Sequence, residues 1–319
     1  MADVFELEEM QREASKLSVG VFGPSGSGKT SGLIKLAMGV RDQLYPGQVL
    51  KDIALLIDTE RRSSTKSVGR SIGGEVLEAL TLYSFEPPYD IEKLYRLLVY
   101  AQEKGFKIAV IDSLSAFWSG KDGILERASE LDVELADKKK AYGAWSEKEI
   151  INKKNILKNI LTNSDMHILF GMRAKTDYVM EANRFGKMVP KSVGLKEDMQ
   201  GDIRYEPDVV LSIDLETHGL TVVKDRLGFE EIMLTDNAEV KPITVGIGAL
   251  LAKLVSEGVS PEELYEKKKK YLIDFVLDEK AHKSSKVAAL EKNQGKELTK
   301  ELLTSLDYDT LTKIVKILK

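Results

Sequence analysis

The sequence contains no cysteine and only three histidines among its 319 residues. The absence of cysteine excludes disulfide bonds, cysteine–zinc sites and thiol catalysis, and it fits a reducing cytoplasm. The histidines are scattered and provide no metal-binding triad. No apolar run approaches the roughly 18 residues of a membrane helix, and the acidic N-terminus lacks a secretory pattern. We therefore expect a cytoplasmic protein without membrane association.

The composition is that of an ordinary globular protein. Hydrophobic residues make up 43% of the chain and charged residues 31%, and the formal net charge is −4. Any contact with nucleic acid must therefore come from local basic patches, because the whole surface is not basic. The length suits one large α/β domain with a small appendage.

Apolar, strand-like runs alternate with helical patterns from residue 17 to about residue 250. This alternation predicts a mostly parallel sheet that is covered by helices on both faces. The expected strands are 17–22, 53–58, 79–83, 107–112, 167–172, 208–214 and 219–224, and the expected helices include 31–44, 90–104 and 145–163. The last two strands follow each other closely, so this edge of the sheet can be antiparallel.

Three parts of the chain are expected. Residues 1–16 form a lead-in, 17–255 form the α/β core, and 256–319 form a small helical module. The module is predicted to begin at a capping box, Ser260 to Glu263, with proline at the first helical position. Within the core, 119–143 and 174–206 interrupt the alternation. We expect both to be functional loops, because they follow strand ends where open α/β sheets place their sites.

A phosphate-binding loop stands at the end of the first expected strand. Residues 23–30 read Gly-Pro-Ser-Gly-Ser-Gly-Lys-Thr, which matches G-x-x-x-x-G-K-[ST], and a helix is expected to follow. Its backbone N–H groups and the helix N-terminus attract an anion. Lys29 would reach the β- and γ-phosphates, and Thr30 would offer its hydroxyl to Mg²⁺. The expected ligands are therefore ATP and Mg²⁺, held by Gly23, Pro24, Ser25, Gly26, Ser27, Gly28, Lys29, Thr30 and Ser31.

Two later strands end in carboxylates. Four apolar residues precede Asp112, which is typical of a Walker B strand whose aspartate holds Mg²⁺ through water beside Thr30. No glutamate follows Asp112, because Ser113 occupies that position. A hydrolase still needs a group that orients and deprotonates water. We assign this role to Glu60, which follows the strand 53–58; the alternative is that Glu60 caps the next helix.

These features together resemble the RecA-type recombinase ATPase core. The resemblance includes Glu60 after an early strand, Ser113-Leu114-Ser115 after Asp112, and the segments 168–175 and 221–226. It covers roughly residues 17–250. The nearest likeness is to phage-encoded RecA-like core ATPases, some of which act as single-strand annealing proteins, and it implies a RecA-like P-loop NTPase fold in the cytoplasm of a bacterial or phage-infected cell.

The resemblance also implies a nucleotide site that is shared between protomers of a filament or ring. Lys224 and Arg226 would reach the ATP of the neighbouring protomer and stabilise charge on its γ-phosphate. One departure concerns the glutamine that couples ATP to the DNA loop in RecA proteins. Gly171 stands at that position, and Arg173 or Lys175 is a candidate replacement.

The stretch 174–206 corresponds to the family's second DNA-binding loop. Basic residues interleaved with aromatic ones suit single-stranded DNA, although acidic residues leave this stretch close to neutral. The candidate DNA contacts are Lys175, Arg184, Lys187 and Lys191. The expected function is ATP-driven recombination on single-stranded DNA, by annealing or strand exchange, with a single-strand binding protein as a candidate partner.

Other functions remain open. A replicative helicase or helicase loader has the same core, and unwinding by a ring would identify it. A nucleotide-switched scaffold protein, whose C-terminal helices recruit a partner, would show no useful turnover. A small-molecule kinase is disfavoured because no arginine-rich lid is evident.

Overall fold

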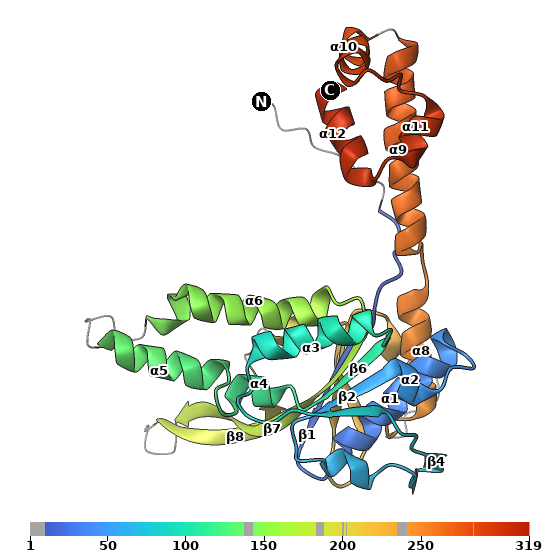
Figure 1. Ribbon diagram of the computed structural model, residues 1–319. Coiled ribbons are helices and arrows are strands. Elements are labelled where there is room, and N and C mark those ends of the chain that lie inside the picture. Colours follow the sequence, from blue (N-terminus) through green and yellow to red (C-terminus); the bar gives the residue numbers. More distant parts are fainter. Residues whose placement is uncertain are drawn as a thin grey trace. The chain divides into compact units, whose positions relative to one another are not determined.

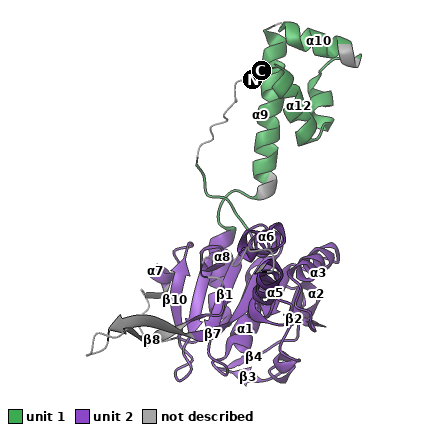
Figure 2. Ribbon diagram, turned by 90° about the vertical axis from the view of Figure 1, so that its left-hand side faces the viewer, with its two compact units in different colours: residues 1–15, 256–319 green, residues 16–255 purple. Residues whose placement is uncertain are grey.

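The computed structural model describes residues 10–136, 143–182, 188–199, 201, 203–234, 241–282 and 284–318. The chain divides into two compact units, one of residues 16–255 and one that combines residues 1–15 with 256–319 (Figure 2). No helix in these described ranges is long and apolar enough to cross a membrane.

The larger unit is an α/β fold built on a mostly parallel sheet (Figure 1). The strand order is β10-β9-β1-β7-β6-β2-β5, and β8 pairs with β7 outside this path. The strands of this sheet are β1 (Ser18–Gly23), β2 (Ala54–Asp58), β5 (Thr81–Ser84), β6 (Ile108–Asp112), β7 (His167–Ala182), β8 (Met188–Glu197), β9 (Val209–Ile213) and β10 (Leu220–Asp225). A separate hairpin joins β3 (Ser71–Ile72) to β4 (Glu75–Val76).

All seven expected strands are present. The strands from β9 to β5 run parallel, and β10 is antiparallel to β9, so the prediction of an antiparallel edge is confirmed. The central strands β1, β2 and β6 are buried along their whole length. This burial explains why they are continuous apolar runs rather than alternating ones.

Helices cover both faces of the sheet. One hydrophobic cluster joins α1 (Lys29–Leu44), α2 (Leu50–Ile53) and α8 (Val245–Ser256) to the first face. A second cluster joins α3 (Ile91–Glu103), α4 (Ser115–Ser119), α5 (Ile124–Ala136) and α6 (Lys148–Thr162) to the other face. The remaining elements are α7 (Phe229–Leu234) and the 3₁₀ turns η1 (Ser63–Lys66), η2 (Ala144–Ser146) and η3 (Ile203–Tyr205).

Helices α1 and α8 approach each other through glycine. A Cβ atom built on Gly39 would lie 2.2 Å from the carbonyl oxygen of Val245. A Cβ atom on Gly248 would lie 2.5 Å from the carbonyl oxygen of Leu36. Both distances are shorter than van der Waals contact, so only glycine allows the two backbones to pack this closely.

The two stretches expected to be loops contain regular structure. Residues 119–143 hold α5, which buries Ile124 and Ala128 against the core. In the stretch 174–206, β7 runs on to Ala182 and forms an antiparallel ladder with β8. Figure 1 shows this hairpin continuing beyond the body of the sheet. The expectation of irregular loops was therefore wrong in both places.

The smaller unit has a hydrophobic core of its own. It contains α9 (Pro261–Ala281), α10 (Ser285–Gln294), α11 (Lys300–Ser305) and α12 (Tyr308–Leu318), and its buried residues include Val276, Leu303 and Leu311. The predicted capping box is present, because Ser260 and Glu263 exchange side chain-to-backbone hydrogen bonds. The described end of the lead-in is extended, and Ala14 N donates to Val259 O at 2.9 Å.

Candidate nucleotide site

The phosphate loop links β1 to α1 in the arrangement that the motif requires. Gly26 and Gly28 have φ values of 86° and 98°, which favour glycine, and α1 begins at Lys29. The Lys29 ammonium donates to the carbonyl oxygens of Gly23 and Pro24 at 2.9 and 2.8 Å. Burial lowers the pKa of Lys29, while the negative charges of Asp112 and Glu60 act in the opposite direction. The lysine is thus held where a phosphate can replace its carbonyl partners.

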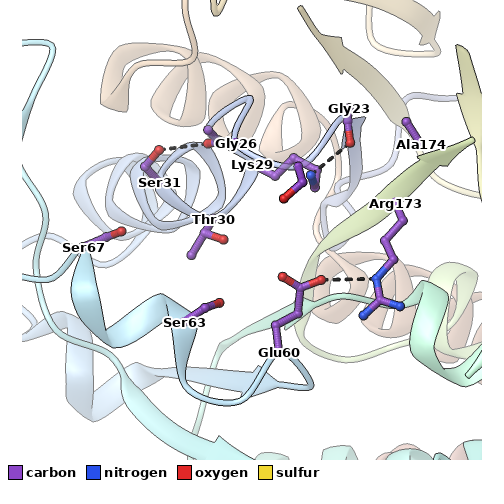
Figure 3. A pocket seen from close by; sticks show the side chains of 12 residues that line it. Gly23, Gly26, Lys29, Thr30, Ser31, Glu60, Ser63, Ser67, Arg173 and Ala174 are labelled. Atoms are coloured by element: carbon purple, nitrogen blue, oxygen red, sulfur yellow. Dashed lines mark hydrogen bonds and ion pairs between the residues drawn. The ribbon is translucent and has the colours of Figure 1, made fainter. Parts of the chain in front are cut away.

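The loop forms one side of a pocket of about 500 Å³. Figure 3 shows that the other side comes from the segment after β2 and from β7. The residues that line it are Gly23, Ser25, Gly26, Gly28, Lys29, Thr30, Ser31, Glu60, Ser63, Ser67, Arg173 and Ala174. The volume falls in the range of small-ligand sites.

Asp112 is 1% exposed and lies beside Thr30, which lines the pocket. Thr30 Oγ1 donates to Asp112 Oδ2 at 2.6 Å, so the two side chains are in contact. Among the described residues, Asp112 Oδ1 has no hydrogen-bond partner although it is buried. Burial raises the pKa of Asp112 to about 6, against the effect of the Thr30 hydrogen bond. A buried carboxylate oxygen without a partner, beside a hydroxyl, fits the oxygen ligands that Mg²⁺ prefers.

Gly171 makes room for this carboxylate. A Cβ atom on Gly171 would lie 3.0 Å from Asp112 Oδ1 and 3.3 Å from Leu33 Cδ1. Gly171 lies inside β7, opposite Val21 of the neighbouring strand, rather than at a strand end. A larger side chain at this position, such as glutamine, would crowd Asp112.

Asp58 shapes the turn that carries Glu60. Asp58 Oδ1 accepts hydrogen bonds from the backbone N–H groups of Glu60 and Arg62 at 2.7 and 3.3 Å. Its Oδ2 accepts one from the Ser64 hydroxyl. The turn also places Arg61 and Arg62 at positive φ values. Such aspartate-to-backbone bonds are a common way to fix a turn, and here they hold Glu60 at the pocket wall.

Glu60 meets Arg173 across the pocket. Arg173 Nε donates to Glu60 Oε1 at 3.3 Å, and Figure 3 shows the two side chains pointing toward one another. Arg173 pairs in the sheet register with Gly23, the first residue of the phosphate loop. Strands β1, β2, β6 and β7 therefore bring together Lys29, Thr30, Glu60, Asp112 and Arg173.

Lys224 and Arg226 lie elsewhere in the same chain. Lys224 pairs with Val210 near the start of β9, whereas the phosphate loop follows the opposite end of the adjacent parallel strand. The two cations donate to backbone carbonyl oxygens of the segment 205–207. Burial, together with the charge of Arg226, lowers the pKa of Lys224 to about 8. Neither side chain lines the pocket of its own chain.

The candidate DNA contacts have different outcomes. Lys175 Nζ forms an ion pair with Asp198 Oδ1 at 3.0 Å, and Ser119 Oγ donates to Asp198 Oδ2 at 2.7 Å. These bonds fix the base of the β7–β8 hairpin to the end of α4. Arg184 and Lys187 lie outside the described residues. Lys191 belongs to β8, but its side chain lies outside the described part of the structure.

Sequence reasoning missed three contributors to the pocket. Asp58 has no role in the sequence prediction, although an acidic residue directly before a turn is a signal for side chain-to-backbone bonding. Ser63 and Ser67 line the wall opposite the loop, and no sequence pattern distinguishes them from other surface serines. Their place becomes evident only from the fold.

Comparison with known proteins agrees with this geometry. The family model described as AAA domain matches residues 15–240, which includes the phosphate loop, Asp112 and the whole pocket lining. No curated protein matches the chain. The matched region spans well over half of the 319 residues. A phosphate loop, a buried aspartate beside its threonine and this match lead to one conclusion: the chain belongs to the AAA domain family and is a nucleotide-binding P-loop NTPase.

Proposed function

We propose that this protein hydrolyses ATP with Mg²⁺ at a site completed by a second protomer, and that it uses the cycle to act on single-stranded DNA in recombination. The observation that carries the proposal is the course of β7. In this strand, Gly171 packs against Asp112 and Arg173 donates to Glu60. The strand then continues into the hairpin with β8. A single strand thus joins the nucleotide pocket to a projecting element.

The roles in the pocket follow from charge and position. Lys29 would exchange its two carbonyl partners for phosphate oxygens, and Thr30 with Asp112 would hold Mg²⁺, which supplies charge neutralisation for the phosphates. Glu60 would orient and deprotonate the attacking water. Its ion pair with Arg173 opposes this role, because Oε1 already accepts from Arg173 Nε and is not available to a water molecule. Release of Glu60 from Arg173 is therefore part of the proposed activation.

Lys224 and Arg226 are proposed to act on the nucleotide of a neighbouring protomer. Their distance from the pocket of their own chain supports a role in trans, since a role in cis would need them at the opposite end of β9. Cations that approach the γ-phosphate in this way accelerate hydrolysis by roughly 10³–10⁵ in other NTPases. We expect Arg226→Ala to lose hydrolysis while it retains ATP binding. If Arg226→Ala hydrolysed ATP as fast as native protein, Arg226 would have no role on the neighbouring nucleotide.

The hairpin is the proposed link to DNA. Its base is fixed by the Lys175–Asp198 ion pair and by Ser119. Arg173 is only two residues from Lys175 in β7. A displacement of β7 at the pocket would therefore also displace Lys175 relative to Asp198. Lys175 would then exchange Asp198 for a phosphate of the DNA backbone.

The test is ATP hydrolysis with and without single-stranded DNA, measured over a range of protein concentrations. Native protein is compared with Lys29→Ala and with the control Lys51→Ala, an exposed lysine outside the pocket. Turnover per protein should rise with protein concentration and with DNA, and it should vanish in Lys29→Ala only. Turnover that is independent of concentration would refute the shared site. Turnover that ignores DNA would refute the recombination role and favour a nucleotide-switched scaffold.

A further inference from the structure

A basic groove lies in the smaller unit between α9 and α11. Its volume is about 660 Å³, and the residues that line it are Glu263, Glu266, Lys267, Lys269, Lys270, Ile273, Lys300 and Thr304. Lys269 joins the two helices, because its ammonium donates to the carbonyl oxygen of Thr304 at 2.9 Å. The groove lies outside the AAA domain match of residues 15–240, so membership of that family gives it no role.

Three of the lysines in this groove carry charge that the fold does not neutralise. Lys267, Lys270 and Lys300 are exposed, and among the described residues none of the three forms an ion pair. Lys280 of the same helix α9 differs, because two glutamates hold its ammonium at 2.7 and 3.1 Å. The groove lysines are therefore available to a ligand.

The groove keeps a net positive charge although glutamates also line it. Four of its lining residues are lysines and two are glutamates. Glu263 belongs to the capping box, where its Oε2 accepts from Ser260 N at 3.4 Å. Ile273, which is 7% exposed, adds apolar surface. A complementary ligand therefore carries several negative charges beside an apolar group.

The chain itself contains a segment of this kind. Residues 3–9 read Asp-Val-Phe-Glu-Leu-Glu-Glu, in which four acidic residues are interspersed with three apolar ones. This acidic segment contains no basic residue. It lies outside the described residues, and residues 1–15 belong to the same compact unit as 256–319.

The described end of the lead-in is attached directly before α9. Val259 N donates to Arg12 O at 2.9 Å, and the Arg12 guanidinium lies 3.0 Å from Glu257 Oε2. Gly258 permits this close approach, because a Cβ atom there would lie 2.5 Å from Arg12 O. The attachment anchors the chain that precedes Arg12 beside the start of the helix that carries the groove.

The groove is within reach of the acidic segment. From Arg12 back to Glu6, six extended residues span up to about 20 Å. From Pro261 to Lys270, α9 rises about 14 Å. A segment tethered this closely has an effective concentration in the millimolar range. Weak individual contacts are therefore sufficient to fill the groove.

We propose that the basic groove binds the acidic segment 3–9 of the same chain. Carboxylates of the segment would pair with Lys267, Lys270 and Lys300, and an apolar side chain of the segment would contact Ile273. This contact would neutralise the groove and attach the lead-in to the smaller unit at a second place. It goes beyond the proposed function, because it uses neither the nucleotide pocket nor ATP.

The absence of cysteine from the chain allows a test by disulfide trapping. In the full chain, Val4→Cys is combined with Thr304→Cys in the groove, or with the control Lys316→Cys, an exposed position of α12 outside the groove. Under mild oxidation, the groove pair should form an intramolecular disulfide at least about tenfold faster than the control pair. The rate should be independent of protein concentration, and it should fall when salt is raised from about 0.05 M to about 0.5 M.

Charge reversal in the groove tests the ion pairs. Lys267→Glu with Lys270→Glu should slow trapping by about tenfold. The matched control is Lys292→Glu with Lys313→Glu, two exposed lysines outside the groove, which should change the rate by less than about twofold. Glu6→Lys with Glu8→Lys, added to the reversed groove, should restore fast trapping, and a misfolded unit would not allow this rescue.

Equal trapping rates for the groove pair and the control pair would overturn the inference, and so would failure of the rescue. Disulfide-linked dimers that increase with protein concentration would overturn the assignment to the same chain, because the segment would then bind a second copy. If trapping shows no preference while Lys267→Glu with Lys270→Glu weakens binding of labelled single-stranded DNA, the groove binds nucleic acid and the inference is wrong. None of these measurements depends on ATP hydrolysis, so the proposed function is tested separately.

Discussion

Replacement of Asp112 by asparagine should stabilise the protein in the absence of nucleotide and Mg²⁺. The side chain is 1% exposed, Oδ1 has no hydrogen-bond partner among the described residues, and Glu60 and Asp58 add negative charge nearby. Asp112→Asn removes the buried charge and keeps an oxygen that can accept from the Thr30 hydroxyl. The carboxylate that the proposed Mg²⁺ site needs thus lowers the free energy of unfolding when no Mg²⁺ is bound.

The magnitude follows from the pKa. Burial raises the pKa of Asp112 from 3.8 to about 6, and each tenfold change in the ionisation constant is worth about 1.4 kcal/mol. At pH 7.5 the ionised group therefore costs the folded state roughly 3 kcal/mol. The side-chain amide that replaces the carboxylate would introduce N–H donors without partners, which costs about 1–2 kcal/mol. The expected net gain in the free energy of unfolding is about 1–2 kcal/mol.

The sign of the pH dependence is specific. Because the folded pKa is raised, the folded chain binds more protons than the unfolded chain between pH 3.8 and about 6. The cost of the charge therefore falls as the pH is lowered, from roughly 3 kcal/mol at pH 7.5 to roughly 1.5 kcal/mol at pH 5. The advantage of Asp112→Asn over native protein should shrink by about the same 1.5 kcal/mol.

The assay is urea unfolding followed by tryptophan fluorescence without Mg²⁺ or nucleotide. Both tryptophans, Trp118 and Trp145, lie in the unit of residues 16–255, so the signal reports on that unit. The control is Asp52→Asn, an exposed aspartate in α2, which should stay within about 0.5 kcal/mol of native. An Asp112→Asn variant that is less stable than native at pH 7.5, or whose advantage grows at pH 5, would refute the reasoning.

Three further predictions test other parts of the fold. Glu60→Gln should lower ATP turnover by roughly 10²–10⁴-fold and keep ATP affinity, as measured by single-turnover kinetics and calorimetry; a variant with native turnover would exclude Glu60 as the base. Burial lowers the pKa of His167 to about 3 from 6.5, so its neutral form should contribute about 2 kcal/mol of stability at pH 7.5 that is lost by pH 5. Between pH 7.5 and pH 5, the free energy of unfolding of His167→Asn should therefore fall by less than that of the native protein, and the difference should equal that amount. Gly39→Ala should reduce the free energy of unfolding by about 1–3 kcal/mol through its clash with Val245, and an unchanged midpoint would contradict the close packing of α1 and α8.

The sequence was sufficient to predict the central sheet because its signals are local. Strands such as β1, β2 and β6 are buried on both faces, so each is a short apolar run that ends in a turn or a functional residue. The sequence was also enough to predict that Lys29, Thr30 and Asp112 lie close together, because the carboxyl ends of parallel strands meet at one edge of the sheet. The meeting of Thr30 with Asp112 at 2.6 Å was predictable on this ground.

The hairpin and α5 escaped prediction for different reasons. The extension of β7 pairs mainly with β8 and leaves the body of the sheet, so its residues lack the apolar period that marks a buried strand. Helix α5 does carry a helical spacing, with Ile124, Ala128 and Leu135 buried, but its many charges obscured this pattern. The Glu60–Arg173 pair depends on the registers of β2 with β6 and of β6 with β7, which no local pattern specifies.

On the proposed function, the position of Arg173 would give the site two exclusive states. Glu60 is the acceptor for Arg173 in the structure at 3.3 Å, and the same carboxylate would be required to hold water beside a γ-phosphate. A γ-phosphate in the pocket offers Arg173 a more highly charged partner than one carboxylate does. On the proposed function, ATP would therefore draw Arg173 away and free Glu60, whereas ADP would let the pair form again. Arg173 and Lys175 belong to one strand and are separated only by Ala174. On the proposed function, the exchange of partners at the pocket would therefore act on the ion pair at the hairpin base through this single residue.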